Sequence, residues 1–460
     1  MVPRSPLILA LALAALGCTE WTPPPVTVDS YTLAGPPEGW SVYEPHVAFA
    51  PDGGVRVAGQ YGPGYNRGGV RFWTAVSDRG RSTWLEEEVV PDAPVLEPTM
   101  AADATVAIGP DGAHYLFGLW ADSRRAGVPD ASLVLSAADP IGGSLRRRRT
   151  LAVVTETEPG VLAASDKPWM IVDPDTSSSP QGTLYFAWTA LTVHLSRDPP
   201  SIERTLVVSS SRDGGYTVSP PIEVAREGMG AQLAVRSDGT LDVIWTELRG
   251  QGRLPSKRLL HVWSRDGGVT FSLPRAVATL DEDGPDWLGH GALAAGPGGA
   301  LHACWPQGRG DSASTRVICN HFTKETRWGI PTPVTTAGGF LSAAYPALTF
   351  GAGSWWLAIY AAREDTLSVQ LLRRHRATGS WETGPVLASA PLDFPRFCAA
   401  PDLPCRRDPS MFTPGDYVSA AGSGTGAAFA YVLPGSGLDD QGRDGSLRVS
   451  IVRTDPDPLP

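Results

Sequence analysis

One pattern recurs seven times along the chain, at intervals of about 60 residues. In each copy an apolar segment meets a turn rich in Pro, Asp or Gly, and a second apolar segment follows, which indicates a hairpin of two β-strands. The seven copies begin at His46, Thr105, Trp169, Gln232, Ala292, Ala347 and Val418. A repeat of this length cannot bury its apolar faces alone, so neighbouring copies must pack against one another.

Two further strands complete most copies. The expected third strands are 71–76, 133–136, 205–209, 259–263, 315–320, 367–373 and 447–452. A fourth strand is expected in the first six copies only, and segment 26–33 (VTVDSYTL) is a strand-like stretch that belongs to no copy. We therefore predict an all-β, seven-bladed β-propeller with four-stranded blades, in which this N-terminal strand closes the last blade. A six-bladed ring with a separate C-terminal appendage is the alternative.

Composition supports this fold class and excludes one class of partner. The chain has 51 Gly and 43 Pro but only 19% charged residues, as expected for many short strands joined by tight turns. Its net charge of -10 offers no basic surface for phosphate groups, so we expect no nucleic-acid partner.

The N-terminus predicts export. Arg4 precedes the apolar run 7–16, which is too short to span a bilayer. Gly17 and Cys18 follow this run and complete the segment Ala15-Leu-Gly-Cys18. This segment resembles a bacterial lipoprotein signal, with Cys18 as the lipidated residue; a plain secretory signal is the alternative. We expect a signal peptide at 1–18, a Pro-rich tether at 19–25 and the propeller at 26–460. The expected product is a monomer, held at the membrane by its lipid alone, in the periplasm or at the cell surface.

Four cysteines remain after Cys18, an even number in an oxidising compartment. Cys398 and Cys405 share one loop, and Cys304 and Cys319 flank a turn. Two local disulfides are expected, and four buried thiols are the alternative.

An eight-residue turn occurs twice, as SRDGGYTV at 211–218 and SRDGGVTF at 264–271. Its Ser and Asp side chains can bond the turn backbone, its glycines permit positive φ, and its last residue returns to the blade. The turn resembles the Asp-box of sialidases, S-x-D-x-G-x-T-W, and is expected between the third and fourth strands. We assign it a structural role.

One register position of the repeat differs from the apolar positions around it. It lies where each first strand enters its blade and is occupied by Glu44, Asp103, Lys167, Gly230, His290, Tyr345 and Asp416. Six of these seven are polar or titratable, which predicts a functional rim at the mouth of the central channel, or a merely solvated rim. Glu44, Asp103, Asp416, His290 and Tyr345 are the candidate catalytic residues, and Lys167 is a candidate ligand-binding residue.

A second regularity, W-x-[DE]-x-R, marks the end of the second strand. It adds Arg124, Arg249 and the variant Arg309 as candidate ligand-binding residues, because a carboxylate can orient an Arg toward an anionic group. Tyr417, beside the long loop 391–415, is a further candidate. No cofactor is expected. A calcium site at Asp281, Asp283 and Asp286 is a weaker possibility, because the segment lacks a known calcium-loop pattern. The arginine run 146–149 indicates either protection of an outer strand or an anionic partner.

With its Asp-box turns, repeats and signal, the chain resembles the sialidase superfamily, among the secreted bacterial propellers with BNR repeats. That resemblance implies a carbohydrate site at the channel mouth. Sialidases also carry an arginine triad, a Tyr–Glu nucleophile pair, an acid/base Asp and an F/Y-R-I-P signature. The corresponding region here, 59–70, offers Arg67 and two tyrosines without the Ile-Pro. The leading hypothesis is a surface-anchored propeller that binds a glycan or anionic polysaccharide. The alternatives are a glycoside hydrolase of the exo-sialidase type or a polysaccharide lyase, and, second, a protein-interaction scaffold.

Overall fold

The fold was analysed in a computed structural model of the 460-residue chain. The structure describes residues 26–33, 41–50, 52–62, 71–77, 83–89, 100–122, 130–138, 143–153, 155–173, 175, 182–198, 200–249, 256–280, 291–309, 312–322, 327–334, 340–374, 379–392, 397, 412–434 and 445–454.

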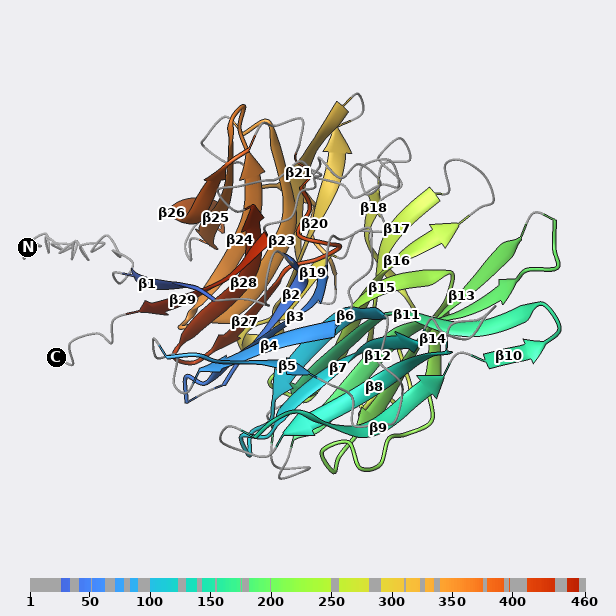
Figure 1. The fold of residues 1–460 in the computed structure, drawn as a ribbon. Helices are drawn as coiled ribbons and strands as arrows, with labels where there is room; N and C mark the ends of the chain where they lie inside the picture. Colours follow the sequence, from blue (N-terminus) through green and yellow to red (C-terminus); the bar gives the residue numbers. More distant parts are fainter. Residues whose placement is uncertain are drawn as a thin grey trace, which may run out of the picture.

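Seven separate antiparallel sheets form a seven-bladed β-propeller, which confirms the predicted fold and excludes the six-bladed alternative (Figure 1). The strands of blades one to three are β2 (Ser41–Phe49), β3 (Val55–Gly62), β4 (Arg71–Ser77), β5 (Leu85–Val89); β6 (Met100–Ile108), β7 (His114–Asp122), β8 (Asp130–Ala138), β9 (Arg146–Val153); and β10 (Thr155–Glu158), β11 (Val161–Asp173), β12 (Thr183–His194), β13 (Ser201–Ser211), β14 (Ile222–Arg226).

The strands of blades four to six are β15 (Gly228–Val235), β16 (Leu241–Arg249), β17 (Ser256–Ser264), β18 (Arg275–Leu280); β19 (Ala292–Ala295), β20 (Leu301–Arg309), β21 (Ser312–Phe322), β22 (Thr332–Pro333); and β23 (Ser342–Gly351), β24 (Ser354–Ala362), β25 (Thr366–Arg374), β26 (Trp381–Pro391). Blade seven contains β27 (Ser419–Ser423), β28 (Gly426–Pro434) and β29 (Gly445–Thr454). Apolar side chains from facing blades form the core clusters.

The N-terminal strand β1 (Val26–Thr32) completes blade seven, as predicted. It pairs with β29 along its whole length, from Val26 opposite Thr454 to Thr32 opposite Arg448. Blade seven in turn packs against blade one, where β27 lies beside β2. Both ends of the chain are thereby joined in one sheet, and β29 has no open edge.

The ring has two ends. The innermost strand of each blade starts at one of them, which we call the mouth end, and the turns between third and fourth strands lie at the other, which we call the tail end. β1 runs as a fourth strand, so Val26 lies at the tail end beside Thr454. Figure 1 shows β1 and β29 side by side at one side of the molecule.

The two repeated turns join third to fourth strands at the tail end. In the second copy, Ser264 Oγ donates to Asp266 Oδ1 at 2.7 Å and accepts from Gly268 N at 2.9 Å. The Asp266 carboxylate accepts from Thr270 N at 2.9 Å and from its hydroxyl at 2.5 Å. Ser211, Asp213 and Thr217 repeat this pattern in the first copy. The residues that the two turns share therefore form the hydrogen bonds that close each turn.

The arginine run lies on β9, the outer strand of blade two, and part of it contacts the neighbouring blade. Arg148 donates to the Gly214 carbonyl at 2.8 Å and its guanidinium lies 4.3 Å from the centre of the Tyr216 ring. Arg149 donates to the Tyr216 carbonyl at 2.7 Å. These two arginines thus attach blade two to the repeated turn of blade three.

Blade three is larger than the repeat predicts. It has a fifth strand, β10, which pairs with the first residues of β11. β11 begins six residues before Lys167, so β11, β12 and β13 project about 20 Å beyond the mouth end as a ribbon. Figure 1 shows this ribbon on the side away from β1 and β29. In the part of the chain that the structure describes, no helix is long and apolar enough to cross a membrane.

Candidate functional site at the channel mouth

The rim residues predicted from the repeat occupy a backbone irregularity that several blades share. In β2, β6, β11, β15 and β23 the pairing with the next strand shifts by a bulge close to the mouth end. The bulges hold residues with positive φ: Glu44 at 51°, Asp103 at 56°, Lys167 at 51°, Gly230 at 68° and Tyr345 at 50°. Left-handed backbone is unfavourable for residues other than glycine and concentrates at functional sites. A bulge also redirects the side chain at its position. The side chains of Glu44, Asp103, Lys167 and Tyr345 therefore do not follow the alternation between the two faces of the sheet.

Three of these side chains converge with Asp416, the rim residue of blade seven. We call Glu44, Asp103, Lys167 and Asp416 the mouth cluster. Lys167 Nζ lies 2.8 Å from Asp103 Oδ1 and 2.5 Å from Asp416 Oδ2. Glu44 Oε1 accepts a hydrogen bond from Asp416 N at 3.1 Å. Oxygens of the three carboxyl groups all lie within 4.8 Å of one another. Residues from blades one, two, three and seven therefore meet at one point.

The mouth cluster is almost closed to solvent. The exposed fraction is 1% for Glu44, 3% for Asp103 and 4% for Asp416, and 12% for the Lys167 side chain. Burial, together with the charge of Asp103, raises the pKa of Glu44 well above its ordinary value, so this carboxyl group keeps its proton to a higher pH than an exposed Glu. Burial also raises the pKa of Asp103, although Lys167 opposes the shift.

Lys167 offsets the repulsion between the buried carboxyl groups of the cluster. Burial acts to lower its pKa, but the carboxylates of Asp103 and Asp416 outweigh burial and hold the pKa well above its ordinary value. Three carboxyl groups of this kind form a donor set for a divalent cation. Here the ammonium already lies within hydrogen-bond distance of two of them, so the described residues fit an internal cation better than a metal.

The segment just before β27 covers the cluster. Glu44 N donates to the Pro414 carbonyl at 2.7 Å, and the Gly415 backbone passes so close to Glu44 that a Cβ at this position would lie 2.3 Å from Glu44 Cγ. Gly415 has φ of 104°, which a residue with a side chain rarely adopts. Thr413 accepts or donates a 3.1 Å bond with the Tyr345 hydroxyl. Segment 412–417 is therefore fitted over the mouth.

Tyr345 and Tyr417 face inward rather than toward solvent. Tyr345 is 2% exposed and Tyr417 3% exposed, and the Tyr417 hydroxyl donates to the Ala104 carbonyl at 3.1 Å. Burial and the nearby Glu44 raise the pKa of Tyr417 well above its ordinary value. The structure thus gives Tyr417 a bracing role between blades seven and two, and a ligand reaches it only if segment 412–417 moves.

A cavity of about 180 Å³ lies inside the ring beneath the cluster. Its lining comes from the innermost strands and is mostly apolar, with His46, Gln232 and Ser419 as polar members. His46 accepts from Val106 N at 3.2 Å, and burial lowers the pKa of this imidazole to about 3. A smaller space of about 10 Å³, enough for roughly one water molecule, is bordered by Tyr345, Asp416 and Tyr417.

For the remaining predicted site residues the structure describes no side chain. His290, Arg124, Cys18, Cys398 and Cys405 lie outside the described residues, as do Asp281, Asp283 and Asp286. Arg249 and Arg309 end β16 and β20, and their side chains lie outside the description.

In one copy of the W-x-[DE]-x-R pattern, the carboxylate bonds an arginine of the adjacent strand. Trp120, Trp245 and Trp305 are buried in the blades. Glu247 accepts from Arg258 Nε at 2.8 Å and Nη2 at 2.5 Å, and Arg258 lies on the adjacent strand β17. Sequence spacing within one strand gave no signal for this cross-strand pair.

One disulfide lies among the described residues, between Cys304 and Cys319. These cysteines are directly opposite one another on β20 and β21, with Cα atoms 4.1 Å apart. The disulfide therefore joins two strands that are already paired in blade five.

Comparisons with known proteins identify the fold but no family. No family model matches the sequence, and no curated protein matches it. Among solved structures, an ulvan lyase bound to a GlcA–Rha3S saccharide is 11% identical, with 88% of this chain and 93% of that chain covered and a TM-score of 0.51. An α-L-arabinanase of Penicillium chrysogenum (14% identity, 94% and 99% covered, TM-score 0.47) and the Hadza microbial sialidase Hz136 (14%, 70% and 63%, 0.46) are more remote in shape. At this identity the likeness shows the propeller fold alone.

Proposed function

We propose that this protein is a surface-anchored propeller that binds an extracellular glycan across the mouth end. The observation that carries the proposal is the convergence of four ionisable side chains from four blades, three of which lie at bulges with left-handed backbone. Each residue with strained backbone costs of order 1–3 kcal/mol, and burial of the charged cluster costs free energy in addition. A binding site at this point would account for both costs. Polar groups at the centre and an adjoining wall suit a hydroxyl-rich or anionic sugar.

The ribbon of blade three supplies that wall. Lys167 and Asp166 lie on β11 where the ribbon leaves the blade, and the Asp166 side chain is 28% exposed. A glycan lying across the mouth meets these two residues first, with the half-buried ribbon residues beside it.

The anchoring part of the proposal follows the chain ends. Lipid at Cys18 and the tether 19–25 would join the membrane to Val26, which lies at the tail end. The mouth would then face away from the membrane, where a polymer has free access. The turns at 211–218 and 264–271 are, on this proposal, Asp-boxes of a BNR-type propeller.

A glycan-array screen tests the binding proposal. The chain from residue 26 onward, which keeps every described strand, is compared with Asp166→Asn, Asp416→Asn and the matched control Asp242→Asn. Asp242 is also buried and bonded, to Arg236 at 2.7 Å and His261 at 2.8 Å, but within blade four and away from the mouth cluster.

The expected result is glycan binding that is weakened in Asp166→Asn and Asp416→Asn and retained in Asp242→Asn. Asp166→Asn is the decisive variant because its side chain is partly exposed and Asn keeps an oxygen that can accept the hydrogen bond from Lys167 N. Absence of binding by the unaltered protein to every glycan contradicts the proposal and directs the search to protein partners.

Catalysis is the second candidate function. It is favoured by the raised pKa of Glu44, which lies beside two other carboxyl groups. A protonated carboxyl beside carboxylates within 4.8 Å resembles the acid and nucleophile of a retaining glycosidase, whose carboxyl groups are about 5 Å apart. Glu44 would give its proton to the leaving oxygen while a carboxylate attacks the anomeric carbon. This requires segment 412–417 to move off the cluster, which is why binding ranks first.

Product analysis separates the two candidates. Any glycan bound in the screen is incubated with the protein and assayed for new reducing ends and for unsaturated products of a lyase. Glu44→Gln is expected to abolish release and leave binding in place if Glu44 is the acid. Release that survives Glu44→Gln removes Glu44 from the mechanism.

A further inference from the structure

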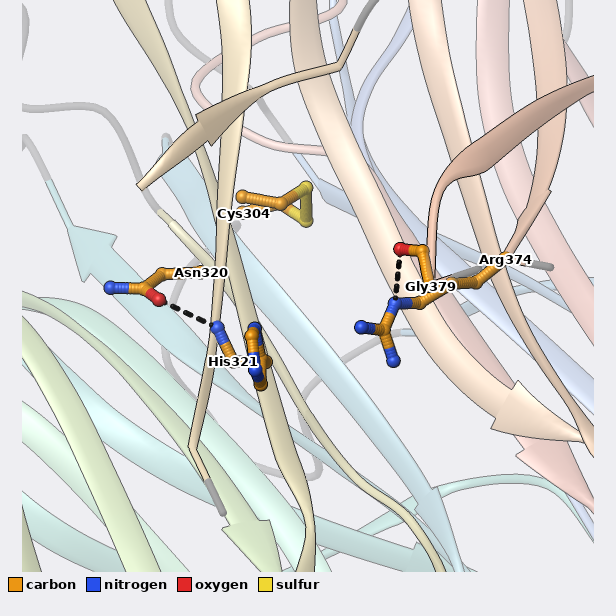
Figure 2. Close-up of a disulfide and its surroundings, with 6 residues drawn as sticks. Cys304, Asn320, His321, Arg374 and Gly379 are labelled. Carbon is orange, nitrogen blue, oxygen red and sulfur yellow. Dashed lines mark hydrogen bonds between the residues drawn. A yellow bond between two sulfur atoms is a disulfide. The ribbon is translucent and has the colours of Figure 1, made fainter. Parts of the chain in front are cut away.

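A second group of ionisable side chains lies between blades five and six, at the tail end. His321 is near the end of β21, His302 lies opposite it on β20, and Arg374 is the last residue of β25. The two imidazole rings are stacked with centres 5.8 Å apart, and the His302 ring is 4.2 Å from that of Trp355. Figure 2 shows the Arg374 guanidinium and the His321 ring turned toward one another from the two blades, beside the disulfide.

The positions of these side chains are fixed by neighbouring backbone. Arg374 Nε donates to the Gly379 carbonyl at 2.9 Å. His321 N donates to Asn320 Oδ1 at 2.8 Å, and Asn320 is held by the carbonyls of Val277 and Gly329. Gly329 lies against the His321 ring, where an added Cβ would be 3.1 Å from Cε1. The group is therefore preorganised on strands rather than on a free surface.

No acid neutralises this group within the described part of the chain. Arg374 forms its one hydrogen bond through Nε, which leaves its terminal N–H groups for another acceptor, and neither histidine ring has a hydrogen bond to a described residue. His302 is nevertheless only 3% exposed, and Arg374 and His321 are half-buried. Half-buried guanidinium groups without a counter-charge are costly unless an anion or acceptor meets them.

We propose that Arg374, His321 and His302 form a binding site for a small oxyanion of the sulfate or phosphate class. The terminal N–H groups of Arg374 donate to two oxygens of the anion, and the His321 ring donates to a third. The site lies at the opposite end of the ring from the mouth cluster and does not depend on the proposed glycan function.

Protonation strengthens this site. Burial and the charge of Arg374 lower the pKa of His302 to about 2, and they also lower the pKa of His321, so both rings are neutral at pH 7 without an anion. The described charged or titratable groups that face the two rings are Arg374 and the other histidine. A bound anion reverses this repulsion, so the affinity is expected to rise as the pH falls from 7 to 5.

Histidine NMR on the full chain tests the proposal, with His321→Phe used to assign the signal. Sodium sulfate, phosphate or acetate replaces chloride at constant ionic strength. Sulfate and phosphate are expected to raise the pKa of His321 by about 1 or more, and acetate to do so less. Arg374→Met should abolish the response. The matched control is Arg373→Met, whose side chain bonds Ser354 and lies over Trp356 instead.

Three results would each overturn the proposal. One is an unaltered protein whose His321 titrates identically in sulfate and in chloride, which needs no variant to fold. Another is an equal sulfate response in Arg374→Met and Arg373→Met, which would mean general screening by salt. A larger response to acetate than to sulfate would also reject the oxyanion class proposed.

Discussion

Replacement of Lys167 by Met tests the electrostatic account of the mouth cluster. Lys167 lies 2.8 Å from Asp103 and 2.5 Å from Asp416, with 12% of its side chain exposed. Removing one partner of a buried ion pair costs about 3–5 kcal/mol, and Met retains most of the packing volume. Because two carboxylates lose their cation together, we expect a loss in the upper half of this range at pH 7.

Urea unfolding measures the loss. With a slope of about 3 kcal/mol per molar urea, the midpoint should fall by about 1.3–1.7 M at pH 7. The sign of the pH dependence follows from Asp103, whose pKa is above its ordinary value in the folded protein and rises further without Lys167. Below about pH 4 the carboxyl groups are protonated in both the folded and the unfolded state, so the loss disappears there and grows as the pH rises.

The triple variant Lys167→Met, Asp103→Asn, Asp416→Asn is the control, because it removes the uncompensated charges as well. It should recover most of the midpoint at pH 7. An unchanged midpoint for Lys167→Met at pH 7 would refute the reasoning, and so would a loss of equal size at pH 4 and pH 7, which would point to packing instead of charge.

Three further predictions concern the scaffold. Asp266→Asn should remove a small stabilisation, below about 1 kcal/mol because the group is exposed. Hydrogen bonds from Thr270 lower the pKa of Asp266 to about 2, so this stabilisation is present above pH 4 and is lost toward pH 2, which acid unfolding of both proteins will measure. Deleting 26–33 exposes the edge of β29 and should produce dimers or aggregates in size-exclusion chromatography with light scattering; a stable monomer would argue against an edge-protecting role. Replacing Cys304 and Cys319 by Ser should cost about 3 kcal/mol for a 15-residue loop, measured against unaltered protein by thermal unfolding, and no change would show that strand pairing alone suffices.

Periodicity predicted the parts of this fold that every blade repeats. The hairpins, the third strands and the closing segment 26–33 follow from apolar patterns and turn residues, and the structure places them accordingly. The rim position was also visible, because Glu44, Asp103 and Lys167 stand at one register among apolar neighbours. Their shared bulge and left-handed backbone explain why one position departs from strand alternation.

Other contacts of the fold could not be predicted from the repeat pattern. Asp416 meets Lys167 only because blade seven returns beside blade one, and nothing in local spacing predicts that pair. Strand β10 reads TETE, a polar segment without an apolar face, and it becomes a strand because β11 offers it an edge. Burial of Tyr417 likewise follows from the Ala104 carbonyl across the channel mouth.

The pairing of β1 with β29 has a mechanical consequence. β1 runs away from the tail end with Val26 as its first residue, and its ladder spans all seven residues. A pull on the N-terminus, directed away from the ring along the strand, loads the hydrogen bonds of this ladder together, in shear. Peeling, which would break them one after another, requires a pull across the strand. If the proposed lipid anchor holds the propeller by its first residues, flow would therefore pull β1 along the direction in which this strand resists force best.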